Sequence, residues 1–189
     1  YGMTETITHV AVKKLNNFHD DKDFSIAESS YFKTLPNIKI SQNKSQCLVI
    51  DAPNILDETI LTNDVVKLHS DTTFEWLGRK DNVINSGGVK LFPEQIEAKL
   101  QPQIASRFFI SKEEDDKFGE QVCLWLKVKE GAAMDEDAVR AYLKAELAYF
   151  KVPRYIRIVD AYPMTVTGKI QKFKMREKMV SELTESHPA

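Results

Sequence analysis

The stretch from Gly78 to Glu97 restricts the possible folds more than any other part of the chain. A strand-like aromatic run at 74–77 (Phe-Glu-Trp-Leu) leads into a charged turn. Two short apolar runs then flank a Gly-Gly pair at 87–88, a pattern typical of a hairpin with unusual backbone angles at the glycines. Pro93 suits the first position of a helix, and Glu94 places a carboxylate near the positive helix end. The stretch therefore predicts a hairpin followed by a helix.

The chain after this stretch alternates between strand-like and helix-like segments, which predicts a compact α+β domain. In one segment, apolar side chains alternate at positions 122, 124, 126 and 128, so we expect a strand with one buried face. A turn is expected at 115–119, where polar residues precede a glycine. The strands expected in this region are Ile104 to Ser111, Gln121 to Lys129 and Tyr155 to Val159.

Three helices are expected in the same region. The first carries Ile96 and Leu100 on one face and ends before Pro102. Asp135 suits the N-cap of the second helix, because its carboxylate can accept a hydrogen bond from the first turn. The second helix carries Val139, Leu143 and Leu147 on one face, and the last carries Met175, Met179 and Leu183.

The region before Gly78 is predicted to be rich in strands. We expect a small antiparallel sheet or distorted barrel that packs on a larger domain. The predicted fold class is therefore α+β, with a β-rich domain at residues 1–80 and an α+β domain at 81–189. The strands expected in the first domain are His9 to Leu15, Ile38 to Ser41, Gln46 to Asp51, Val65 to His69 and Thr73 to Leu77.

Charge and composition exclude several classes of function. The 189 residues carry a formal net charge of −2, which gives no bulk attraction to nucleic acid or to a membrane surface. No apolar run is long enough to span a bilayer, and we expect a cytoplasmic protein. Cys47 and Cys123 lie in apolar runs and are interpreted as buried, reduced thiols. The first residue is Tyr1 rather than a methionine, and it lies inside a motif described below. We therefore expect this chain to be an excised fragment of a longer protein.

Three motifs together resemble those of the adenylate-forming (ANL) superfamily, which contains acyl-CoA synthetases, adenylation domains of nonribosomal peptide synthetases, and luciferases. The hinge region of that superfamily resembles the central stretch described above. The other two motifs lie near the ends of the chain. The motif residues here are Gly78-Arg79-x-Asp81, Ser86-Gly87-Gly88 and Pro93-Glu94-x-Ile96-Glu97 in the centre, Tyr1 to Thr6 at the start, and Pro163 to Lys172 near the end.

The resemblance implies an ATP site that includes the first motif. Tyr1 would lie against the adenine, Thr4 would contact a phosphate, and Glu5 would hold a magnesium ion. Each role suits the side chain: an aromatic face for a base, a small hydroxyl donor for phosphate and a hard carboxylate for a hard cation. In the same superfamily, residues aligned with Asp64 and Arg79 bind the ribose hydroxyls. Residues 61–64 depart from the superfamily pattern, because Asn replaces the usual Gly before Asp64.

The resemblance also implies a two-step reaction. A carboxylate is a poor nucleophile toward the α-phosphate of ATP because both are anionic, so a magnesium ion at Glu5 and an ammonium at Lys169 would neutralise charge. The superfamily's small domain then rotates about a hinge, which aligns with Asp81, before CoA attacks the acyl-adenylate. Gly88 would leave room for the pantetheine arm of CoA.

Within the superfamily, residues 46–97 are most similar to o-succinylbenzoate–CoA ligases of menaquinone biosynthesis. The predicted substrates are a small carboxylic acid, ATP and CoA, and the predicted partner is a missing N-terminal domain. Another aryl- or acyl-CoA ligase, a carrier-protein-loading adenylation domain and a non-catalytic binding module with this fold remain alternatives. Thr8 and His9 are possible neighbours of the acyl pocket, although a structural role is the simpler interpretation of His9.

Overall fold

The computed structural model describes residues 1–6, 9–13, 31–101, 104, 106–128, 135–166, 168, 170–172 and 174–175. The chain divides into two compact units, Tyr1–Asp81 and Asn82–Ala189. The boundary lies one residue beyond the predicted one, which fell between residues 80 and 81. Each unit has its own sheet and its own core, and each is described separately below.

The first unit contains a six-stranded sheet in the order β1-β2-β6-β5-β4-β3. All neighbouring strands are antiparallel, as predicted. Among the described residues, β1 and β3 are the edges of this sheet. The elements are the 3-10 helix η1 (Thr4–Thr6) and the strands β1 (Ala11–Val12), β2 (Phe32–Thr34), β3 (Lys39–Gln42), β4 (Cys47–Asp51), β5 (Ile60–Leu68) and β6 (Thr73–Arg79).

The core of this sheet comes from alternate residues of the central strands, including Leu48, Ile50 and Phe74, which are almost fully buried. Several strands differ from the sequence prediction; for example, β1 begins at Ala11 rather than His9, and β6 continues to Arg79 rather than ending at Leu77. Strand β5 begins at Ile60, five residues before the expected Val65, because residues 60–64 continue the ladder with β4 and β6. Strand β2 was not predicted, since its three residues are too few to show a period.

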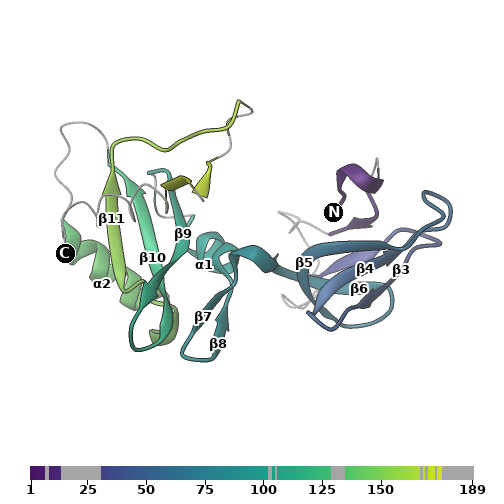
Figure 1. Cartoon of the computed structure of the whole chain (residues 1–189), viewed down its shortest axis with the longest axis horizontal. Coiled ribbons are helices and arrows are strands. Elements are labelled where there is room, and N and C mark those ends of the chain that lie inside the picture. The colour runs from purple at the N-terminus through teal and green to yellow at the C-terminus, as the bar shows by residue number, and fades with distance from the viewer. Residues whose placement is uncertain are drawn as a thin grey trace, which may run out of the picture. The chain divides into compact units, whose positions relative to one another are not determined.

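The second unit contains a five-stranded sheet with β10 at its centre (Figure 1). Strand β9 pairs with β10 antiparallel over most of its length, whereas β11 pairs with β10 in parallel. The hairpin of β7 and β8 joins near Gly119, at the start of β10. The elements are η3 (Lys80–Asn82), β7 (Ile84–Ser86), β8 (Val89–Leu91), α1 (Pro93–Leu100), β9 (Phe108–Asp115), β10 (Gly119–Lys127), α2 (Glu136–Glu146), η4 (Tyr149–Lys151) and β11 (Tyr155–Val159).

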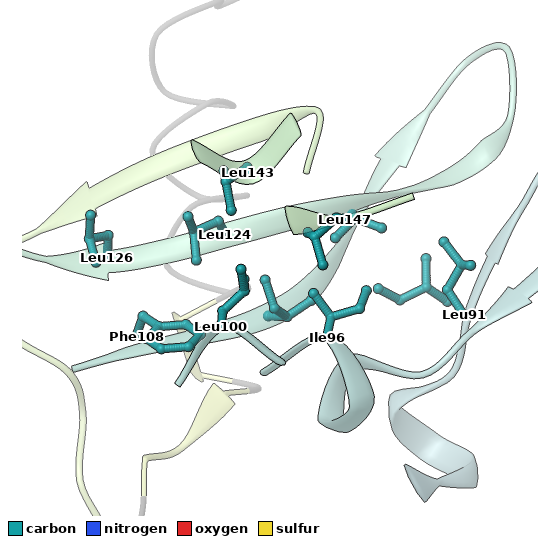
Figure 2. Packing of buried hydrophobic residues seen from close by; sticks show 11 residues of the cluster. Leu91, Ile96, Leu100, Phe108, Leu124, Leu126, Leu143 and Leu147 are labelled. Carbon is teal, nitrogen blue, oxygen red and sulfur yellow. The ribbon is translucent and has the colours of Figure 1, made fainter. Parts of the chain in front are cut away.

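Two helices pack on this sheet as the sequence predicted. Helix α1 begins at Pro93 and buries Ile96 and Leu100. The Asp135 side chain caps α2 by accepting a hydrogen bond from the Ala138 N–H at 3.1 Å. Figure 2 shows the core between these helices and the sheet, whose labelled members are Leu91, Ile96, Leu100, Phe108, Leu124, Leu126, Leu143 and Leu147.

The prediction that β10 buries only one face was wrong. Leu124 faces the core formed with the helices, but Cys123 and Trp125 on the opposite face are also buried. Tyr162 and Met175, which come after β11, cover that second face. Cys123 is a free buried thiol, as predicted, and so is Cys47 in the first unit. The other residues of the predicted last helix stripe, Met179 and Leu183, lie outside the described residues.

We expect Leu124→Ala to lower the free energy of unfolding of the second unit by about 3 kcal/mol, because it removes a fully buried side chain from the core. Ile158→Ala in β11 is the matched control, since its side chain is 52% exposed, and should cost less than about 1 kcal/mol. Urea unfolding followed by circular dichroism measures both values. Equal losses for the two variants would contradict this assignment of the core.

Candidate functional site

Three of the residues predicted to bind the nucleotide lie together in the first unit. The Tyr1 hydroxyl donates a hydrogen bond to Asp64 Oδ2, and Arg79 Nη1 lies 3.6 Å from Asp64 Oδ1. Asp64 and Arg79 are directly opposite each other in the β5–β6 ladder. The Asp64 side chain is 8% exposed, whereas that of Arg79 is 48% exposed. The cluster therefore combines a shielded carboxylate with a cation that reaches solvent.

A β-bulge and a buried threonine hold Asp64 in place. Val65 pairs with Gly78 and Val66 pairs with Trp76, so β6 has one extra residue next to the Asp64–Arg79 pair. Thr62 Oγ1 accepts a hydrogen bond from the Asp64 N–H at 3.1 Å and donates to the Leu48 carbonyl at 2.8 Å. The motif pointed to Asp64 but gave no signal for Thr62, which becomes important only through its place in the sheet.

The Tyr1 ring packs edge-on against Phe32 and Phe74, with centroids 5.9 and 5.5 Å away. Burial raises the pKa of the Tyr1 phenol well above its ordinary value, and the hydrogen bond to Asp64 raises it further. The phenol therefore stays protonated at neutral pH and acts as the donor in its bond to Asp64.

Thr4 and Glu5 are exposed in η1, next to Tyr1 in the chain. Buried Thr6 closes this turn, because its hydroxyl donates to the Met3 carbonyl at 3.0 Å and accepts from the Met3 N–H at 3.1 Å. Within the described residues, no group of three or more His, Cys, Asp or Glu side chains gathers in a way that could hold a metal ion. A single exposed carboxylate such as Glu5 nevertheless suits Mg²⁺, which proteins usually bind with one or two carboxylates plus substrate phosphates.

The predicted hinge residue, Asp81, is the last residue of the first unit and is exposed. Its neighbours are held within their own units. Lys80 Nζ donates to Ser45 Oγ at 3.3 Å in the first unit, and Asn82 Nδ2 donates to Glu94 Oε1 at 2.6 Å in the second. The boundary between the units thus lies at the Asp81–Asn82 peptide bond, and Asp81 separates two residues that are each anchored within their own unit.

The two glycines of the β7–β8 turn have different surroundings. Both have positive φ, +56° for Gly87 and +85° for Gly88. A Cβ on Gly87 would lie 3.0 Å from the Phe118 ring, but a Cβ on Gly88 would meet no atom within 4 Å. Gly88 borders an open depression of about 520 Å³, whose other lining residues are Asn85, Glu114, Asp115, Asp116, Phe118, Gly119 and Glu120. Close packing against Phe118 and a positive φ both favour glycine at 87, whereas at 88 the positive φ alone favours it and the space beside it is open.

Lys169 itself lies outside the described residues, as does Thr8. The residues on both sides of Lys169 are described. Met164 and Ile170 form an isolated antiparallel bridge, and Gly168, with φ of +78°, donates its N–H to the Thr165 carbonyl at 2.9 Å. His9 is exposed and forms a backbone bridge with Gly2.

Within the described residues, the structure contains no helix long and apolar enough to cross a membrane. The expected cytoplasmic location stays a prediction.

Comparison with known proteins finds a matching family, related sequences and similar solved structures. Residues 96–169 match the family described as the AMP-binding enzyme C-terminal domain. The chain is 34% identical over 129 residues to the mitochondrial medium-chain acyl-CoA ligase ACSF2 of Rattus norvegicus, an alignment that covers 67% of this chain and 21% of that protein. The chain thus spans about a fifth of the length of this relative.

Two solved structures extend the comparison to most of the chain. An acyl-CoA synthetase (AMP-forming)/AMP-acid ligase II-like protein from Dyadobacter fermentans is 33% identical, with a TM-score of 0.50 over 95% of this chain and 50% of that one. The o-succinylbenzoate CoA synthetase of Bacillus subtilis, solved with its acyl-adenylate intermediate, is 21% identical, with a TM-score of 0.75 over 93% of this chain and 40% of that one. The second likeness concerns the fold, and it confirms the predicted α+β class.

Proposed function

We propose that this chain, whose residues 96–169 match the family described as the AMP-binding enzyme C-terminal domain, is the C-terminal part of an ATP-dependent acid–CoA ligase. The complete ligase would also contain a large ATP-binding domain, of which residues 1–80 are the last portion, and residues 81–189 would be its mobile domain. The observation that carries the proposal is the cluster of Tyr1, Asp64 and Arg79. These positions are far apart in sequence, and the motifs assign all three to one nucleotide.

In the proposed nucleotide site, Asp64 accepts hydrogen bonds from the ribose hydroxyls of ATP. A carboxylate offers about four acceptor positions, so the hydrogen bond from Tyr1 and the ion pair with Arg79 leave capacity for a ligand. The partly exposed Arg79 guanidinium supplies donors and a positive charge at the same place. Tyr1 presents an aromatic face to the adenine while its hydroxyl keeps Asp64 oriented.

The first reaction step joins the acid to AMP and releases pyrophosphate. Thr4 donates a hydrogen bond to a phosphate oxygen, and Glu5 is the residue that would hold Mg²⁺. The bound ion supplies charge neutralisation on the phosphates. Lys169 supplies a compact positive charge where the carboxylate and the α-phosphate meet.

The second step transfers the acyl group to the thiol of CoA. The missing side chain at Gly88 lets the pantetheine arm run along the backbone, which is consistent with the open space around that residue. Asp81 is the hinge about which the second unit turns between the two steps. Support for this hinge comes from the unit boundary and from the anchored neighbours on either side.

Two carboxylic acids are the leading candidates for the substrate. The resemblance of residues 46–97 favours o-succinylbenzoate, and the name of the rat relative favours a medium-chain fatty acid. The aligned relatives are acyl-CoA ligases, which makes loading of a carrier protein or a purely binding role the weaker alternatives.

The decisive experiment supplies the complete ligase with ATP, magnesium, CoA and either o-succinylbenzoate or octanoate. Pyrophosphate release and the CoA thioester are both measured. We expect both products to form with one of the acids. Pyrophosphate without thioester, together with acylation of a carrier protein, would favour the carrier-loading alternative, and the absence of pyrophosphate with a broad panel of acids would refute the proposed activity.

The same assay gives a prediction for the 189-residue chain alone. We expect no acyl-adenylate above background, because the chain covers only a fifth to a half of its relatives and the remainder of their ATP and acyl sites has no counterpart in it. As a positive control, a separately produced large domain is added to the 189-residue chain. Turnover by the chain alone would contradict the proposal that it is one part of a larger catalytic site.

A further inference from the structure

Within the second unit, an ion pair joins two of the three sequence motifs. Glu97 is the last residue of the Pro-Glu-x-Ile-Glu motif in α1, and Lys172 is the last residue of the motif that spans Pro163 to Lys172. Lys172 Nζ donates a hydrogen bond to Glu97 Oε1 at 2.6 Å. The same oxygen accepts the Ile110 N–H of β9 at 2.7 Å, so Glu97 connects a helix, a strand edge and the C-terminal segment.

The position of this pair makes it stronger than an ordinary surface contact. The side chains of Lys172 and Glu97 are 27% and 24% exposed, which limits screening by solvent. The Lys172 ammonium also lies 5.4 Å from the centre of the Phe109 ring, a second favourable interaction. Two independent contacts therefore fix Lys172 against α1 and β9.

The other end of the segment has its own anchor. Tyr162 donates its hydroxyl to the Arg107 carbonyl at 2.8 Å and to the Trp125 carbonyl at 3.2 Å. Burial raises the pKa of Tyr162 to about 12, so this phenol remains a donor at any physiological pH. Residues 163–171 are therefore held at both ends, by Tyr162 before them and Lys172 after them.

Between the anchors, the chain folds back on itself. The Gln171 N–H donates to the Pro163 carbonyl at 2.8 Å, and Gln171 Nε2 donates to the Met164 carbonyl at 3.3 Å. With the Met164–Ile170 bridge, these bonds close a loop whose ends are fixed. Lys169 belongs to this loop by sequence.

We propose that Glu97 and Lys172 are a positioning pair that fixes the loop at 163–171 for the first reaction step. This inference rests on the proposed function, in which Lys169 acts during adenylation. Misplacing a catalytic group by about 1 Å can cost a reaction up to about a hundredfold in rate. A pair that ties the loop to α1 and β9 thus supports catalysis without touching the substrate.

Lys172→Met in the complete ligase tests the proposal, because methionine keeps the aliphatic length and removes the charge. We expect the kcat of ATP–pyrophosphate exchange to fall about tenfold, with less than about a twofold change in the KM for ATP. Thioester formation from supplied acyl-adenylate should change by less than about threefold, and Lys172→Arg should restore most of the exchange rate. Lys174→Met, an exposed lysine in the same segment, is the matched control and should have little effect.

A double-mutant cycle tests whether the two residues act together. Glu97→Gln keeps an oxygen acceptor for the Ile110 N–H but weakens the contact with Lys172. If the pair is the working unit, the double variant should be no slower than the slower single variant, within about twofold. If the rate losses of the two single variants instead multiply in the double variant, the pairing is refuted.

Hydrogen exchange on the 189-residue chain gives a readout that does not depend on the proposed function. Lys172→Met should speed exchange at the Gly168 and Gln171 amides, which are bonded within the loop. If amide exchange is faster in the Lys172→Met chain but the complete wild-type ligase makes no acyl-adenylate, the proposed function is refuted and the anchoring role of Lys172 stands. Unchanged exchange, or equal losses in both half-reactions, would overturn the positioning role.

Discussion

Lys169→Ala in the complete ligase should lower the rate of acyl-adenylate formation by about two to three orders of magnitude, which corresponds to about 3–4 kcal/mol in the barrier. The cause is electrostatic: the reacting carboxylate and the α-phosphate are both anionic, and a water-poor site magnifies the loss of a positive charge between them. ATP–pyrophosphate exchange measures this step. Thioester formation from supplied acyl-adenylate should fall far less, since the hinge motion would move Lys169 away before CoA attacks.

Lys174→Ala is the control for this experiment, because it removes the same charge from an exposed position five residues later. It should leave both half-reactions within about twofold of wild type. If Lys169→Ala lowers both steps by the same factor, then the lysine has a general structural role and the proposed assignment fails.

Asp81→Pro should separate the two half-reactions by about a hundredfold, sparing one and crippling the other. A hinge residue must adopt different φ and ψ angles in the two working states. Proline fixes φ near −65° and also restricts the residue before it, here Lys80, which is anchored to Ser45. The substitution should therefore favour one state of the ligase at the expense of the other.

Lys44→Pro provides a matched control for the hinge experiment. Lys44 is exposed in a turn that the Gln46 N–H closes on the Asn43 carbonyl at 2.9 Å, a position where turns accept proline. It should leave the ratio of the two half-reactions unchanged. An equal loss in both steps for Asp81→Pro would count against the hinge, and no loss in either would make Asp81 an ordinary turn residue.

Local signals predicted those parts of the fold that depend on neighbouring residues. Short-range chemistry correctly predicted Pro93 at the start of α1 and the Asp135 cap of α2. It also predicted the turn between β9 and β10, which ends at Gly119. The second buried face of β10 was missed because Tyr162, which covers it, is 37 residues away from Trp125 in the sequence. Alternation within a strand carries no information about such distant cover.

The candidate site also contains some residues that the sequence predicted and others that it did not. The motif identified Asp64 and Arg79, and the ladder places them opposite each other. Thr62 had no signal in the sequence, and the motif that ends at Lys172 gave this lysine no role, because a threonine in a strand and a lysine in a polar segment are common features. Their roles arise only from contacts with residues distant in the chain.

The boundary at Asp81 has a consequence for how the reaction would respond to dilution. The chain passes once between the two units, through the short turn η3, and their cysteines form no cross-link. A short tether of this kind sustains an effective local concentration in the millimolar range. In the proposed ligase, delivery of Lys169 to a nucleotide bound near Asp64 would therefore be a first-order event, independent of enzyme concentration. A ligase cut after Asp81 would instead depend on the product of the two fragment concentrations.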